Sequence, residues 1–242
     1  MKLLSVFLVL LLVAPVSADV LVFDKYETVS HVEGNKIHID REMTITNVAR
    51  NPVIPGELHF QIYQSDGSTK KGLKVDSFTA TNDRNTALST KVINKDDQTD
   101  LSVMIWDPLL PGFSYTFRIS YDLYFEPSGL LFYELKIPQE ETTIPIKDVK
   151  QTVLLDTKYH VTYAPQTDVS QISGNVVVSW SGQNDQQVIE YSTLPLPRIG
   201  VRAVNVFWGF VIVLLITVFV VTVRRRRRQQ AEQTEQVGEI GG

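Results

Sequence analysis

The stretch that decides the fold is YTFRISYDLYF at positions 115–125. Large apolar residues fall on every second position from 115 to 123, while Arg118, Ser120 and Asp122 fall between them. A period of two is that of a β-strand with one face in a hydrophobic core and the other in solvent. The stretch therefore predicts a half-buried strand in an antiparallel sheet.

The same alternation continues on both sides of this strand. Apolar residues fall at 37, 39, 43, 45 and 48 of the segment 36–48, in which we expect a bulge near Arg41. Polar turns separate the strand candidates, and no helical period occurs outside the two apolar terminal segments. We therefore expect an all-β fold, an antiparallel immunoglobulin-like β-sandwich, as one unit or two packed sub-domains. Further strands are expected at 58–62, 101–106, 149–155, 158–163, 175–180 and 187–191.

The N-terminal segment 1–18 has the composition of a secretory signal peptide. A lysine at position 2 precedes an apolar run, and Pro15 then precedes the small residues up to Ala18. An uncleaved anchor is the alternative, but the run is short against the roughly 20 residues that a span needs. We expect cleavage after Ala18.

The C-terminal apolar segment 204–223 predicts a transmembrane helix, because 20 residues without a charge span the hydrocarbon core. Phe207 and Trp208 lie near its start, where aromatic rings favour the membrane interface, so we expect them to anchor the helix. Five arginines follow as a stop-transfer signal and place the tail in the cytoplasm, in type I orientation in the cell membrane. They are Arg224, Arg225, Arg226, Arg227 and Arg228. Membrane lipid is the expected partner of the helix and of this arginine run.

These signals divide the chain. The external β region covers 19–193, with a possible internal boundary at 138–146, where two prolines flank polar residues. The proline-containing segment 194–203 is expected to be a short extended stalk above the bilayer. The tail 224–242 is expected to be basic at first and then disordered.

The composition narrows the class of protein. The segment from 19 to 200 holds 24 acidic and 16 basic residues, a net charge of −8, which argues against nucleic acid as a partner. The chain has no cysteine and no Asn-X-Ser/Thr site, so its core must hold without disulfides. Both absences favour a prokaryotic envelope protein over an animal surface receptor.

No motif predicts catalysis. Thiol chemistry is excluded, and the nucleophile-elbow, zinc-peptidase and P-loop patterns do not occur, so we expect no catalytic residue, no metal and no cofactor. His38 and His59 lie on consecutive strand candidates and could share a metal, but exposed strand histidines are the expected case. The acidic loop 96–100 could bind calcium, yet it lacks the spacing of a calcium loop and suits a solvated hairpin tip. Scattered carboxylates could act in glycan hydrolysis, namely Asp107, Glu126 and Glu134.

Two segments share a pattern: NPVIPG at 51–56 and DPLLPG at 107–112. Proline fixes φ at the second position of a type II turn, and glycine accepts the positive φ at the third. A duplicated module is one explanation. We favour the other, that two corners of one sandwich meet the same steric demand.

The sequence thus predicts a single-pass envelope protein whose external sandwich is a non-catalytic binding module or an accessory subunit of a membrane or cell-surface complex. The expected partner is a protein at the cell surface or in the membrane. An extracellular carboxylate-dependent glycan hydrolase is the first alternative, and a signalling subunit acting through a partner in the membrane is the second.

Overall fold

The structure, a computed structural model, describes residues 20–66, 68–125, 129, 131–172, 174–182, 187–198 and 200–240, with only the backbone described at 66 and from 228 onward. The signal segment and Ala18 therefore lie outside the described residues. The described chain forms 15 strands and one long helix. Their bounds are β1 (Leu21–Glu33), β2 (Lys36–Asn47), β3 (Gly56–Asp66), β4 (Thr69–Gly72), β5 (Val75–Asn82), β6 (Ser89–Asn94), β7 (Thr99–Ile105), β8 (Ser114–Tyr124), β9 (Phe132–Lys136), β10 (Gln139–Thr142), β11 (Val149–Asp156), β12 (His160–Tyr163), β13 (Asp168–Ile172), β14 (Asn175–Ser181), β15 (Val188–Ser192) and α2 (Ala203–Ile240).

The largest sheet has seven strands in the order β13-β14-β11-β1-β2-β8-β5. Its pairs are antiparallel except β1 with β11, which run parallel from Tyr26–Val149 to Val32–Leu155. The prediction of a β-rich fold is confirmed, while that of an entirely antiparallel one is wrong at this pair. A parallel neighbour requires a long crossover connection, and here that connection contains β2 to β10.

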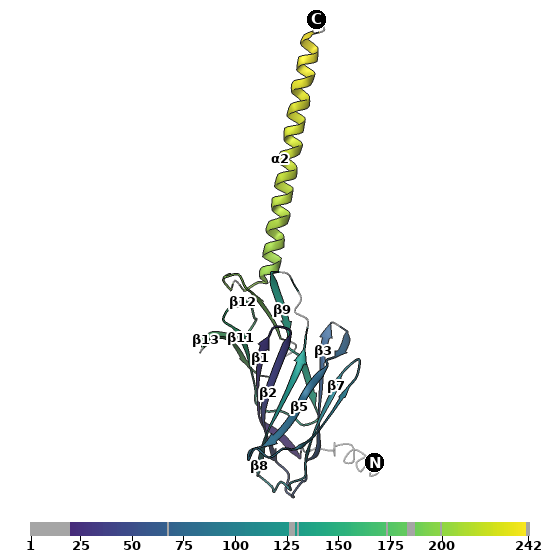
Figure 1. Cartoon of the computed structure of the whole chain (residues 1–242), viewed down its shortest axis with the longest axis vertical. Helices are drawn as coiled ribbons and strands as arrows, with labels where there is room; N and C mark the ends of the chain where they lie inside the picture. The colour runs from purple at the N-terminus through teal and green to yellow at the C-terminus, as the bar shows by residue number, and fades with distance from the viewer. Residues whose placement is uncertain are drawn as a thin grey trace, which may run out of the picture.

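A five-stranded sheet packs against the inner face of the large one. It has the order β10-β3-β7-β6, with β4 paired to β3. One cluster of buried apolar side chains draws on both sheets, and the rings of Phe23 and Phe60 meet across the interface with centroids 6.1 Å apart. The two sheets therefore share a single hydrophobic core, which lies below α2 in Figure 1.

The alternation that predicted β2 and β8 is confirmed: the expected apolar residues of both strands lie in the core, except that Tyr115 is half-buried against it, while Val48 lies beyond the end of β2 and is exposed. The bulge expected near Arg41 is wrong. The register of β2 with β8 is unbroken from Lys36–Tyr124 to Thr46–Ser114, and the irregularity lies in β1, between Phe23 and Lys25. Arg41 therefore keeps the phase of its strand and points inward.

The segment suggested as an internal boundary, 138–146, takes part in both sheets. Its strand β10 pairs with β3, and the backbone of Phe23 binds the carbonyl of Pro145 and the N–H of Lys147, each at 2.9 Å. Beyond it the chain completes the large sheet with β11, β13 and β14, and its strands β12 and β15 join the earlier β9 in a small sheet of order β12-β15-β9.

The small sheet lies at the end of the domain from which α2 emerges (Figure 1). A part of α2, Ala203–Arg227, is long and apolar enough to cross a membrane. The helix does not end at the arginines but continues to Ile240. The residues after the span, expected to be disordered, thus extend the helix, because Arg, Gln, Glu and Ala are strong helix formers.

Candidate functional site

Two loops at the end of the domain opposite α2, 48–55 and 106–113, form what we call the distal tip (Figure 1). They contain the two similar Pro-Gly segments, and they bind each other. The N–H of Val53 donates to the carbonyl of Leu109 at 3.0 Å, and the N–H of Leu109 donates to the carbonyl of Val53 at 2.7 Å. Gly56 and Gly112 have φ of 70° and 75°, as the predicted turns require.

Asn47, the last residue of β2, holds the two loops of the distal tip together. Its fully buried side chain donates through Nδ2 to the carbonyls of Asn51 and Leu109, each at 2.8 Å, and accepts from the N–H of Ala49 through Oδ1 at 2.9 Å. Its backbone carbonyl also accepts from the N–H of Gly112 at 2.8 Å. One side chain thus satisfies backbone groups of both loops, which fixes their relative position.

Large apolar side chains project from this braced scaffold. Trp106 is 66% exposed and Phe113 is 62% exposed, although both lie beside buried strands. Single exposed apolar residues are ordinary, but several on adjoining segments mark a contact surface. The exposed apolar residues of the distal tip and the chain next to it are Val20, Val48, Ile54, Trp106, Leu110 and Phe113.

A second feature is a cavity of about 350 Å³ between the sheets, into which Arg41 projects from β2. Arg41 Nη1 forms an ion pair with Glu140 Oε2, and Arg41 Nε donates to Thr28 Oγ1 at 2.9 Å. The hydroxyl of Tyr26 donates to Glu140, and Tyr121 accepts a weaker bond from Arg41 Nη2 at 3.4 Å. The pair therefore links the large sheet to β10 of the five-stranded sheet.

The groups that line this cavity favour the charged form of Arg41 and the neutral form of the two tyrosines. Burial by itself would lower the pKa of Arg41, but the Glu140 carboxylate and the adjacent tyrosines raise that pKa above its usual value. Burial raises the pKa of Tyr26 and of Tyr121, so both hydroxyls keep their protons. Glu140 is the one carboxylate among the described residues that line this cavity. With its charge bound to Arg41, the arrangement suits a structural cross-link between sheets.

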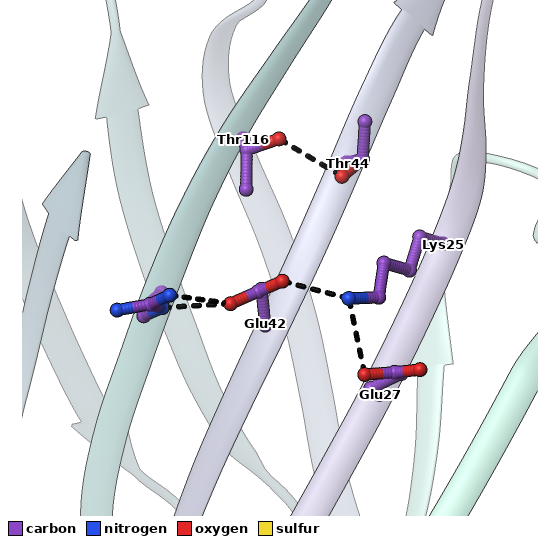
Figure 2. Close-up of polar contacts among 6 residues, drawn as sticks. Lys25, Glu27, Glu42, Thr44 and Thr116 are labelled. Carbon is purple, nitrogen blue, oxygen red and sulfur yellow. Dashed lines mark hydrogen bonds and ion pairs between the residues drawn. The ribbon is translucent and has the colours of Figure 1, made fainter. Parts of the chain in front are cut away.

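The outer face of the large sheet carries charges in cross-strand rows. Figure 2 shows Lys25 reaching both Glu42, at 2.7 Å, and Glu27, at 3.1 Å. Glu42 also accepts from Arg118, at 2.8 Å from Nε and 2.7 Å from Nη2. These bonds, first from Lys25 and then from Arg118, lower the pKa of Glu42 below its usual value. Next to this row, the hydroxyls of Thr44 and Thr116 are 2.9 Å apart (Figure 2).

The structure places the histidines differently from the sequence prediction. His38 in β2 lies in the large sheet and His59 in β3 lies in the five-stranded one, so the suggestion that they pair across adjacent strands to share a metal is wrong. His38 instead faces Asp122, with Nδ1 2.8 Å from Oδ1, and its ring lies 6.5 Å from that of His31. Consecutive strands of a sandwich often belong to different sheets, which a pattern of alternation alone cannot reveal.

The other candidate ligands and acids do not converge. Among the residues that the structure describes, no three His, Asp or Glu side chains group as a metal site. In the acidic loop 96–100, Asp100 binds Lys95 at 2.5 Å and Gln98 at 2.9 Å. Asp107 belongs to the distal tip, Glu134 lies in the small sheet, and Glu126 is outside the described residues.

The small sheet and the first turn of α2 form a joined base. The N–H of Ala203 donates to Glu190 Oε1 at 2.8 Å, and Thr162 donates to the same oxygen at 2.6 Å. Arg202 binds Glu134 at 2.8 Å. A buried carboxylate at a helix N-terminus satisfies a free N–H and complements the helix dipole. Sequence reasoning missed Glu190, because nothing in a strand reveals that a helix begins beside it.

The predicted membrane residues lie along α2. Phe207 and Trp208 are in its second turn, with ring centroids 5.8 Å apart, and the five arginines follow within the same helix. Within the expected stalk, 194–203, described residues contact the domain through Arg198, Arg202 and Ala203. Arg198 donates to the carbonyls of Ala164 and Thr167, the latter at 3.2 Å.

Comparisons with known proteins give partial likenesses. No protein family model matches the chain. An uncharacterised protein of Methanocaldococcus jannaschii is 28% identical over 136 residues, which are 56% of this chain and 96% of that protein.

Among solved structures, the M1 zinc metallopeptidase of Deinococcus radiodurans matches with a TM-score of 0.40 and 13% identity, over 72% of this chain. A mutant of that enzyme bound to a Tyr-Ser-Ala substrate matches with a TM-score of 0.42 and 13% identity, over 71% of this chain. The chain spans 42% of the length of each peptidase chain. The function is therefore inferred from the geometry of the chain itself.

Proposed function

We propose that this chain is a single-pass type I envelope protein and that its external β domain is a non-catalytic binding module, an accessory subunit of a cell-surface or membrane complex. The observation that carries the proposal is the distal tip. Five exposed apolar side chains lie on two loops that bind each other and are braced by a buried asparagine, and Val20 of the adjoining chain adds a sixth.

The chemistry of the distal tip favours a protein as its partner. Trp and Phe are enriched in protein interfaces, where they fill pockets at low entropic cost. Exposed charges, Arg50 and Asp107, border the apolar residues, as in the polar rim of an interface. Because the loops are already held in place, binding would order little additional backbone.

The orientation follows from the helix and its flank. The 25-residue candidate span Ala203–Arg227 is apolar up to residue 223 and ends in arginines, which is typical of a type I anchor with the arginines on the cytoplasmic side. The distal tip then points away from the membrane and toward other components of the envelope. An immunoglobulin-like arrangement of the two large sheets is part of this proposal, supported by their shared core.

The hydrolase alternative is weaker on physical grounds. Glu27 and Glu42 border a common hollow on the outer face, but Lys25 joins them. A glycosidase needs one carboxylic acid with a raised pKa, whereas the pKa of Glu42 is lowered. The signalling alternative would act through a partner in the membrane.

The test is affinity purification of the tagged full-length protein from its native membrane, followed by mass spectrometry, with three forms of the chain. These are the wild type, the double variant Trp106→Ser/Phe113→Ser at the distal tip, and a matched control, Ile93→Ser, on an exposed position of β6. We expect one partner to co-purify stoichiometrically with the wild type and the control and to be lost from the tip variant. A partner retained by the tip variant, or no reproducible partner at all, would overturn the proposal.

A further inference from the structure

Three leucines outside the distal tip are exposed at the opposite end of the domain: Leu131, Leu194 and Leu196, at 38%, 43% and 37% exposure. Ser192, the last residue of β15, joins two of them. Its hydroxyl donates to the carbonyl of Leu131 at 2.8 Å and accepts from the N–H of Leu194 at 3.0 Å. We call this end of the small sheet the proximal edge.

The proximal edge lies at a defined level along α2. Phe132, the first residue of β9, has its ring centroid 6.0 Å from that of Phe207, which in turn contacts Trp208. Phe and Trp at the start of a span favour the boundary between headgroups and hydrocarbon. The proximal edge thus lies beside Phe207 and Trp208, the side chains expected to mark the membrane boundary along α2.

The contacts at the base hold this level in place. Glu190 receives the N–H of Ala203 in a buried position, and Arg202 is paired with Glu134 of β9. Arg198 binds carbonyls of the loop after β12, so the segment before the helix is also fixed to the domain. These contacts fix the small sheet to the start of α2. While α2 is inserted, the sheet therefore stays close to the membrane surface.

We infer that the small sheet docks on the lipid bilayer, with Leu131 and Leu194 of the proximal edge entering the interfacial region beside Phe207. The partner is the outer-leaflet lipid, and the driving force is burial of apolar area next to an existing span. The domain then stands directly on the membrane at a fixed angle, in place of the stalk that the prolines suggested. This inference rests on the proposed insertion of α2.

The test uses the natural lack of cysteine, which allows a single nitroxide label to be placed anywhere on the full-length chain. Labels at Leu131→Cys and Leu194→Cys report on the proximal edge in phosphatidylcholine vesicles. Ile54→Cys at the distal tip is an aqueous reference of comparable exposure, and Ile216→Cys in the middle of α2 is a hydrocarbon reference. Power-saturation spectroscopy compares collisions of each label with oxygen and with a water-soluble nickel complex.

We expect the ratio of oxygen to nickel accessibility at Leu131 and Leu194 to be several-fold higher than at Ile54 and to approach that at Ile216. If both edge labels match Ile54 while Ile216 reports hydrocarbon, the anchor stands and the docking is overturned. If Ile216 itself reports water, the insertion of the helix and the docking both fall. All four positions are exposed, so the substitutions leave the packed core intact.

Discussion

Arg41 and Glu42 are consecutive residues of one strand, yet they carry two different kinds of ion pair. Arg41 points between the sheets and pairs with Glu140 inside a cavity, where both side chains are largely removed from solvent. Glu42 instead pairs with Lys25 (Figure 2) and with Arg118 on the outer face of the sheet. Both faces pair carboxylates with basic side chains, so a difference in stability between the two kinds of ion pair reports the effect of burial.

Burial changes what the loss of one partner costs. On the outer face water solvates whichever charge is left, and salt screens the attraction. Between the sheets an unmatched charge has little water to replace its partner, and the penalty is several kcal/mol. Four measurements, in order of decreasing effect, can break or sharpen this contrast.

The largest effect is expected for Glu140→Ala. It leaves the Arg41 guanidinium and the Tyr26 hydroxyl without their acceptor and should lower the free energy of unfolding by about 3–5 kcal/mol. Urea unfolding of the full-length chain in detergent measures it, followed by tryptophan fluorescence, to which Trp180 at the same cavity contributes. The double variant Arg41→Met/Glu140→Met is the control and should recover most of the loss. A loss below about 1 kcal/mol for the single variant would show that water reaches the pair.

An intermediate effect is expected for Glu190→Ala at the base. Without its carboxylate, the N–H of Ala203 and the hydroxyl of Thr162 lose a buried acceptor, which costs about 1–3 kcal/mol. Hydrogen exchange at Ala203 and in β15 should accelerate, while exchange in β2 and β8 stays unchanged. Uniform acceleration throughout the domain would instead place Glu190 in the global core.

A smaller effect is expected for Glu42→Gln, at most about 1 kcal/mol, and it should shrink further at high salt. Because the folded-state pKa of Glu42 lies below its usual value of 4.5, its stabilisation is present above that pH and is lost as pH falls through the folded value. Wild type and variant should therefore converge in stability in acid. Divergence on acidification would contradict this assignment.

The smallest effect is expected for Thr116→Val. It removes a neutral cross-strand hydrogen bond to Thr44 but keeps the shape and the strand propensity of the side chain, so the change should be a few tenths of a kcal/mol. Thermal unfolding midpoints of the two forms should almost coincide. A shift as large as that of Glu42→Gln would mean that the threonine row, and not the charges, holds this face together.

The sequence predicts the strands whose apolar alternation is uninterrupted, β2 and β8, and the apolar helix. It does not predict β1, although this strand lies near the centre of the large sheet. An irregularity after Phe23 shifts its phase, and the small polar residues Thr28 and Ser30 occupy its inner face. Apolar alternation with a period of two residues cannot be recognised when a bulge shifts the alternation by one residue and some of the buried residues are polar.

The candidate surfaces were predicted in part. The two Pro-Gly segments drew attention to the distal tip, and the structure adds that they bind each other, which only tertiary pairing can determine. Arg41 had a signal that could have been used, since strict alternation from Ile37 to Ile45 places it in the core. Its partner Glu140 had none, because it arrives from a distant segment with no periodic pattern.

The parallel pairing of β1 with β11 has a consequence for the biogenesis of the chain. During synthesis β1 appears early, whereas β11, the strand that pairs with its second edge, begins only at residue 149. Until then a sheet of β1, β2 and β8 exposes one unpaired edge, which is a template for pairing with other chains. Contacts so distant in sequence also slow folding. Expression of chains truncated before β11 should therefore give aggregates, and capture of the nascent chain by chaperones should fall once β11 has been synthesised.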